Sequence, residues 1–113
     1  MKNLEKNIYI YSVEAIGWAK SMEKTPADSE QLKTFKFAAG NMYKQFSDAV
    51  ISEDNKVFAD HLRASLKQGK QSAQLLDAFT IEEQSLKNQQ TNLQTRIEDI
   101  INQLEEVTGK IIY

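Results

Sequence analysis

The residue types in this chain that are best suited to chemistry are one histidine and several adjacent carboxylates. His61 is the only histidine, and there is no cysteine to act as a thiolate or to bind a soft metal. A di-iron bundle needs paired Glu-x-x-His motifs, but the residue three positions before His61 is Phe58. No Gly-x-Ser-x-Gly motif and no glycine-rich phosphate loop occurs either. We therefore expect no catalytic residue and no enzymatic activity, with His61 as a boundary residue that makes a local hydrogen bond.

The adjacent carboxylates could in principle bind a hard cation, which prefers oxygen ligands. They form three pairs, namely Glu82 with Glu83, Glu98 with Asp99, and Glu105 with Glu106. On an amphipathic helix such pairs are typical of the solvated face. We therefore expect neither a metal site nor a cofactor.

Aromatic residues and an apolar C-terminal tripeptide are the strongest signs of a contact surface. Tyrosine and tryptophan could stack on a ligand, but they more often lie at a core edge or a subunit interface with the polar tip in water. The last three residues are apolar, where a terminus is normally polar and frayed. An uncovered apolar patch usually marks an interface. The residues expected at the interface are Tyr9, Tyr11, Trp18, Ile111, Ile112 and Tyr113.

Lysines on two neighbouring segments suggest a second kind of contact. If those segments are antiparallel helices, the side chains could form one basic strip that contacts phosphates without reading sequence. The alternative is that they are ordinary solvated lysines. The net charge of −2 and the pI of about 5.4 do not favour a nucleic-acid binder. The lysines concerned are Lys33, Lys36, Lys44, Lys67 and Lys70.

Helices are expected to position all of these side chains. The helix with the clearest sequence pattern lies in the last third of the chain. From residue 93 onward the apolar residues are spaced alternately four and three apart. This heptad pattern predicts a long helix over residues 81–110 that presents a narrow apolar stripe to partner helices. Gln90 interrupts the stripe, and it either sets the register of packing or lies at a wet end of the bundle. The stripe consists of Leu86, Leu93, Ile97, Ile100, Leu104, Val107 and Ile111.

Three earlier helices are predicted over residues 4–22, 26–51 and 53–78, because apolar residues there also recur three or four apart. The breaks are expected near Thr25, Ser52 and Thr80. Thr25 is expected to cap a helix that starts at Pro26, Ser52 to cap the next, and Thr80 to open a capping box with Glu83. A glycine inside the second helix, Gly40, predicts a close helix crossing.

Composition supports a single helical domain over residues 1–113. The chain has only 4 glycines and 1 proline, so it has few turns and long elements. The predicted fold is all-α, an antiparallel up-down four-helix bundle with a heptad-patterned C-terminal helix. No apolar run approaches the roughly 18 residues of a membrane span, and the first residues lack the apolar stretch of a signal peptide. We expect a soluble cytoplasmic protein that does not contact membranes.

Residues 38–67 resemble a known family. The segment has a turn of small residues in the second helix, an acid-Ala pair near its end, and a third helix opened by serine. These features resemble the bacterial four-helix-bundle proteins related to those encoded in intervening sequences of large-subunit ribosomal RNA genes. The resemblance implies a left-handed up-down bundle, a homopentameric ring in some members and no enzymatic activity. It also points to nucleic acid as a partner, because one relative binds it through a basic surface. The matching residues are Asp48, Ala49, Ser52, Phe58, Leu62 and Leu66.

Together these features favour a small non-enzymatic helical interaction or assembly protein that self-associates or binds another helical protein. One alternative is a nucleic-acid-binding accessory module that uses the lysine strip. A second alternative is a helical secretion-partner or immunity protein.

Overall fold

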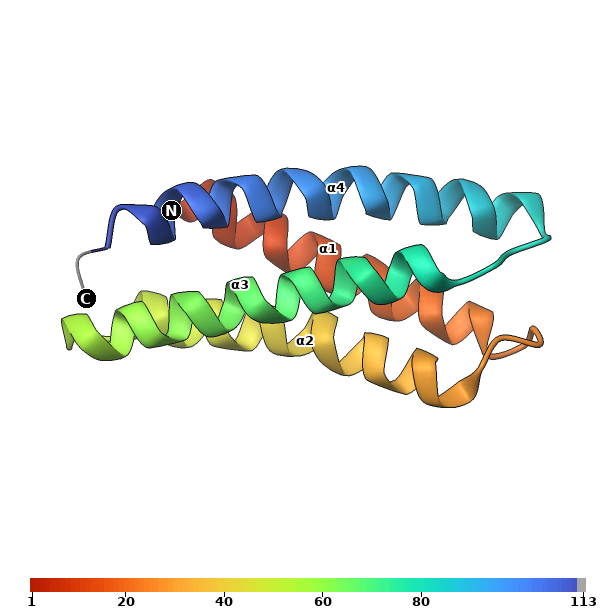
Figure 1. Cartoon of the computed structure of the whole chain (residues 1–113), viewed down its shortest axis with the longest axis horizontal. Helices are drawn as coiled ribbons and strands as arrows, with labels where there is room; N and C mark the ends of the chain where they lie inside the picture. The colour runs from red at the N-terminus through yellow and green to blue at the C-terminus, as the bar shows by residue number, and fades with distance from the viewer. Residues whose placement is uncertain (112–113) are drawn as a thin grey trace.

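The computed structural model describes residues 1–111 and contains four helices (Figure 1). They are α1 (Lys2–Met22), α2 (Ser29–Ile51), α3 (Asn55–Ala78) and α4 (Gln84–Gly109), and no strand occurs within the described residues. The helices lie side by side in a rod of 45 × 22 × 19 Å. The predicted all-α four-helix fold is confirmed, and so is the break between the third and fourth helices.

The helices form a ring in which each contacts its two neighbours. α1 packs against α2 and α4, and α3 packs against α2 and α4. Short connections reverse the chain after each helix, so the bundle is up-down and antiparallel (Figure 1). The α1–α2 and α3–α4 connections lie together at one end, while the N-terminus and the α2–α3 turn lie at the other.

The apolar stripes predicted for the helices face the core. On α4 the heptad is buried from Leu86 to Leu104, and on α1 the residues spaced three or four apart are also buried, namely Leu4, Ile8, Tyr11, Ala15, Trp18, Ala19 and Met22. Two apolar residues beside the α2–α3 turn, Val50 and Val57, are each 43% exposed.

Of the glycines within helices, Gly69 and not Gly40 has a neighbouring helix packed tightly against it. A Cβ atom added to Gly69 would lie 2.9 Å from the Sδ atom of Met42 on α2. Ser65, one turn earlier, donates a hydrogen bond to the carbonyl oxygen of Met42 at 2.8 Å. At Gly40 an added Cβ would meet only Ile16, at an ordinary 3.6 Å. The prediction of a close crossing at Gly40 is therefore wrong, and the small side chains of α3 permit the approach instead.

Acidic side chains cap α2, α3 and α4, two or three residues after the expected positions. The carboxylates of Asp28 and Asp54 each accept a backbone N–H of the first turn at 2.9 Å. Glu83 accepts two such N–H groups, from residues 85 and 86, at 2.9 and 3.2 Å. The predicted caps at Thr25, Ser52 and Thr80 are wrong.

Two of the predicted capping residues make other hydrogen bonds in the connections, and the third makes no cap. Thr25 donates to the carbonyl oxygen of Met22 at 2.6 Å and so helps to end α1. Ser52 donates to the carbonyl oxygen of Asp54 at 3.2 Å, within the turn. Thr80 is exposed and caps no helix. Each connection contains an acidic residue closer to the helix start, and that residue supplies the cap.

The cap assignment gives a direct test in the α3–α4 connection. Replacing Glu83 with alanine is expected to lower the free energy of unfolding by about 1 kcal/mol, because two N–H groups of α4 lose their acceptor. Replacing Thr80 with alanine is expected to change it by less than about 0.5 kcal/mol, since that residue is exposed. Urea denaturation of both variants measures the difference. If the Thr80 variant loses more free energy of unfolding than the Glu83 variant, the capping box predicted from the sequence would be supported instead.

Candidate functional site

Two of the expected interface residues lie inside the core instead of on the surface. Tyr11 is fully buried and Trp18 is only 2% exposed. The hydroxyl groups of Tyr11 and Ser72 lie 3.1 Å apart, and Trp18 Nε1 donates to the carbonyl oxygen of Leu86 at 3.0 Å. The polar tip of each side chain finds its partner on a helix of the same chain. Neither side chain is available to a second protein, so this part of the prediction is corrected.

Trp18 belongs to a cluster of three aromatic rings at one end of the core. Its ring centroid lies 5.7 Å from that of Phe35 and 5.6 Å from that of Phe79. Phe35 and Phe79 are 6.0 Å apart, and all three pairs meet edge to face. This geometry is favourable for aromatic pairs beyond the area they bury. The cluster therefore joins α1, α2 and the α3–α4 connection.

Burial of Tyr11 also affects its ionisation. Desolvation raises the pKa of the Tyr11 phenol well above its usual value of 10, and this effect outweighs the hydrogen bond with Ser72. In the unfolded chain the same phenol would ionise near pH 10. Folding therefore favours the protonated form.

The raised pKa predicts a loss of stability at alkaline pH. Above pH 10 the unfolded state loses the Tyr11 proton while the folded state keeps it, so unfolding becomes more favourable by up to about 1.4 kcal/mol per pH unit. The contribution is fully present below pH 10. Tyr11→Phe is expected to show a shallower decline between pH 10 and 11. Urea denaturation across this range measures both slopes, and equal slopes would show that Tyr11 does not couple to folding.

Besides Val50 and Ile51 at the end of α2, three large apolar side chains of α1 and α2 are exposed. Tyr9 is 51% exposed, Val13 is 52% exposed and Phe37 is 65% exposed. Tyr9 and Val13 are one helical turn apart on α1, and the Tyr9 ring packs edge-on against Tyr43 of α2 at 5.2 Å. Phe37 lies six residues before Tyr43, about 9 Å along α2 and about 120° around it. We call Tyr9, Val13 and Phe37 the α1–α2 patch.

Only Tyr9 of this patch was among the expected interface residues. Phe37 and Val13 could have been found from the helical period alone, because each falls on the side of its helix opposite the apolar stripe. Ile111 is half-buried and packs against the core. Ile112 and Tyr113, the other expected interface residues, lie outside the described residues.

The five candidate lysines do not form a single strip. Lys36 forms an ion pair with Glu23 at the end of α1 and holds the pKa of that carboxyl below its usual range. Lys70 lies 3.6 Å from Glu105 of α4. Lys36 therefore lies on the α1–α2 side of the ring, and Lys70 lies on the α3–α4 side.

The other three lysines are exposed. Lys44 pairs with Asp48 at 3.1 Å, whereas Lys33 and Lys67 form no ion pair within residues 1–111. Three of the five ammonium groups are thus already matched by a carboxylate. The antiparallel arrangement of α2 and α3 is as expected, but it does not gather these charges.

His61 makes the local contact that was predicted for it. Its Nδ1 atom lies 2.7 Å from the Oε1 atom of Gln45 on α2, and the ring is half-buried. Within the described residues, no three His, Cys, Asp or Glu side chains gather closely enough to hold a metal ion. Over the same residues, no helix is both long and apolar enough to cross a membrane.

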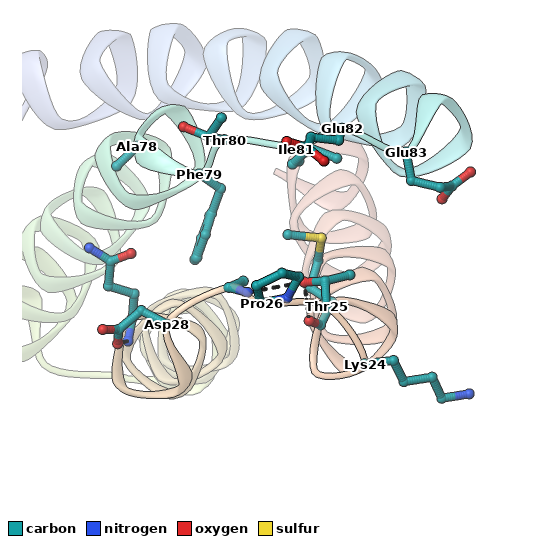
Figure 2. Close-up of a pocket in the computed structure, with 13 residues that line it drawn as sticks. Lys24, Thr25, Pro26, Asp28, Ala78, Phe79, Thr80, Ile81, Glu82 and Glu83 are labelled. Carbon is teal, nitrogen blue, oxygen red and sulfur yellow. Dashed lines mark hydrogen bonds between the residues drawn. The ribbon is translucent and has the colours of Figure 1, made fainter.

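A cavity of about 610 Å³ lies at the end of the bundle where the α1–α2 and α3–α4 connections meet (Figure 2). We call it the end cavity. The buried side chains of Met22 and Phe79 form its floor, with the half-buried Ala27 and Ile81 beside them. The rest of its lining comes from exposed residues of the two connections. These are Lys24, Pro26, Asp28, Gln31, Ala78, Thr80, Glu82 and Glu83, together with the half-buried Thr25.

Comparisons with known proteins identify no relative. No protein-family model matches the chain, and no curated protein or solved structure is significantly similar to it. The resemblance to the intervening-sequence proteins stays a prediction.

Proposed function

We propose that this protein is a small non-enzymatic assembly protein that associates with a second copy of itself through the α1–α2 patch. The observation that carries the proposal is the exposure of Tyr9, Val13 and Phe37 on two adjacent helices. Scattered apolar residues are normal on a protein surface, but aromatic residues grouped with other apolar ones mark contact sites. Most soluble oligomers are symmetric dimers in which the same patch contacts itself.

The patch has the composition of an interface centre rather than of an interface rim. Two of its three residues are aromatic, and tyrosine supplies a large contact area at a small cost in conformational entropy. Tyr9 is held in place by Tyr43, so little further ordering is needed when a partner binds. Lysines flank the patch on α2 at positions 33 and 44, which provides a charged rim.

The nucleic-acid alternative has less support, because the candidate lysines lie on different sides of the ring and three of them are ion-paired. Protein–nucleic acid affinity falls steeply with salt when several phosphates are contacted. Salt-dependent binding to RNA or DNA would favour that alternative. A stable complex with a different protein from its own cell would favour the secretion-partner or immunity alternative.

The proposal predicts a mass in solution that rises with concentration above the 12.9 kDa of one chain. Replacing both Val13 and Phe37 with lysine is expected to weaken association at least about tenfold, because the charges would meet across a symmetric interface. Light scattering at micromolar concentrations measures the effect. The control is Val57→Lys, at a valine near the start of α3 that is 43% exposed, which should leave association unchanged.

Two results would overturn the proposal. A mass of 12.9 kDa at every concentration would exclude self-association under these conditions. Equal weakening by Val57→Lys would place the contact elsewhere. Thermal melting of each variant verifies that the folded monomer is intact, as expected for substitutions at exposed positions.

A further inference from the structure

Gly40 of α2 lies between residues of the proposed interface. It follows Phe37 by three residues and precedes Tyr43 by three, so it lies about 4.5 Å along the helix and about 60° around it from each of them. Phe37 belongs to the α1–α2 patch, and Tyr43 packs against the Tyr9 ring of the patch. Gly40 itself is half-buried. The surface of α2 therefore lacks a side chain midway between two aromatic residues.

Packing within the chain does not require a glycine at this position. The backbone of Gly40 is ordinary right-handed helix, with no positive φ. An added Cβ atom would meet only the Cδ1 atom of Ile16, at 3.6 Å, so no helix of the same chain crosses closely there. Glycine is nevertheless less favourable than alanine inside a helix, because it loses more backbone freedom on folding. A close contact from outside the chain would account for its presence.

We propose that Gly40 is the point at which a helix of the second copy approaches α2 most closely. This inference rests on the proposed self-association through the α1–α2 patch. A glycine at a helix crossing lets two backbones come close together, and the larger side chains beside it then pack against the partner helix. Here those side chains are Phe37 on one side and Tyr43 with Tyr9 on the other. In a symmetric dimer both copies present this position to the contact.

The test is Gly40→Ala, with Gly17→Ala as the matched control. Both glycines lie inside a helix, and both positions accept a Cβ atom without a close contact. Gly17 lies on the side of α1 that packs against α4, where it lines a hollow with Gln89 and Leu93. Both substitutions are expected to raise the melting temperature of the dilute, monomeric chain by about 2–5 °C, because alanine favours the helix.

Only Gly40→Ala is expected to weaken association. The dissociation constant should rise at least about fivefold, since an added methyl group at a close-packed crossing forces the two backbones apart. Sedimentation equilibrium over a dilution series measures the constant for the wild-type chain and both variants. A damaged fold cannot explain such a loss, because the same variant melts at a higher temperature than the wild-type chain.

The outcomes separate the crossing at Gly40 from self-association itself. If lysine at positions 13 and 37 weakens association but Gly40→Ala does not, the α1–α2 patch is the interface and the close approach at Gly40 is wrong. Equal weakening by Gly17→Ala would also overturn the inference, because the effect would then not depend on the crossing. A wild-type mass of 12.9 kDa at every concentration would overturn the proposed function and this inference together.

Discussion

Replacing Trp18 with alanine is expected to lower the free energy of unfolding by about 3–5 kcal/mol, the range for removing a large buried aromatic side chain. The indole packs edge-on against Phe35 and Phe79 and donates to the carbonyl oxygen of Leu86. Truncation would leave a cavity where α1, α2 and the α3–α4 connection meet. Domains of this size have a total stability of only about 5–15 kcal/mol, so the loss would be a large part of it.

Trp18→Phe is the matched control for this prediction. Phenylalanine keeps an aromatic ring in the cluster but loses the N–H donor to Leu86, so a smaller loss of about 1–3 kcal/mol is expected. Urea denaturation followed by far-ultraviolet circular dichroism measures both, because the signal does not depend on the tryptophan. A loss below about 1 kcal/mol for the alanine variant would contradict the packing described.

Replacing Gln90 with glutamate is expected to cost at least about 3 kcal/mol at neutral pH. Gln90 is 8% exposed, and its Nε2 atom donates to the carbonyl oxygens of Leu76 and Phe79 at 2.8 and 3.1 Å. These carbonyls lie at the C-terminal end of α3, which is the negative end of the helix dipole. A carboxylate there would lose both hydrogen bonds and place a negative charge against two acceptors.

The pH dependence distinguishes charge from shape in this prediction. Protonation of the new carboxyl removes the repulsion, so the stability of Gln90→Glu is expected to recover as the pH is lowered toward the pKa of a free glutamate. Gln90→Leu, which keeps the size but has neither donor nor charge, should cost about 1–3 kcal/mol. Thermal and urea denaturation from neutral to acidic pH measure all three chains. A glutamate variant with the same stability as wild type at pH 7 would contradict the role of Gln90.

The role of Gln90 illustrates what periodicity leaves open. The residue interrupts the apolar stripe of α4, and from the sequence it could set register or lie at a wet end. In the structure Gln90 is buried and donates a hydrogen bond to the carbonyl oxygen of Leu76 near the end of α3, fourteen residues earlier in the chain. Such a partner depends on how two helices meet, and no local pattern contains that information. Gly69 is similar, because its close neighbour Met42 belongs to another helix.

The sequence by itself determined the four helices and most of their buried faces. Periodic apolar residues specify a helix and its inward side, because burial of one stripe is the main favourable term for each element. The positions of the three breaks also followed from the sequence, although the capping residues did not, since several polar residues in each connection could accept the same N–H groups. The residues near a helix end therefore predict that the helix ends there, but they identify the capping residue only where a single side chain can accept the N–H groups.

Only the tertiary structure decided which aromatic and charged residues remain accessible. Tyr9 and Tyr11 are two residues apart on α1, yet one is half exposed and the other is fully buried beside Ser72 of α3. Lys36 and Lys70 could have shared a surface, but their carboxylate partners lie on α1 and α4. The end cavity likewise exists because two connections, more than fifty residues apart in the chain, meet at one end. Each depends on the lateral arrangement of the helices, which arises from packing between elements and not from the pattern within any one of them.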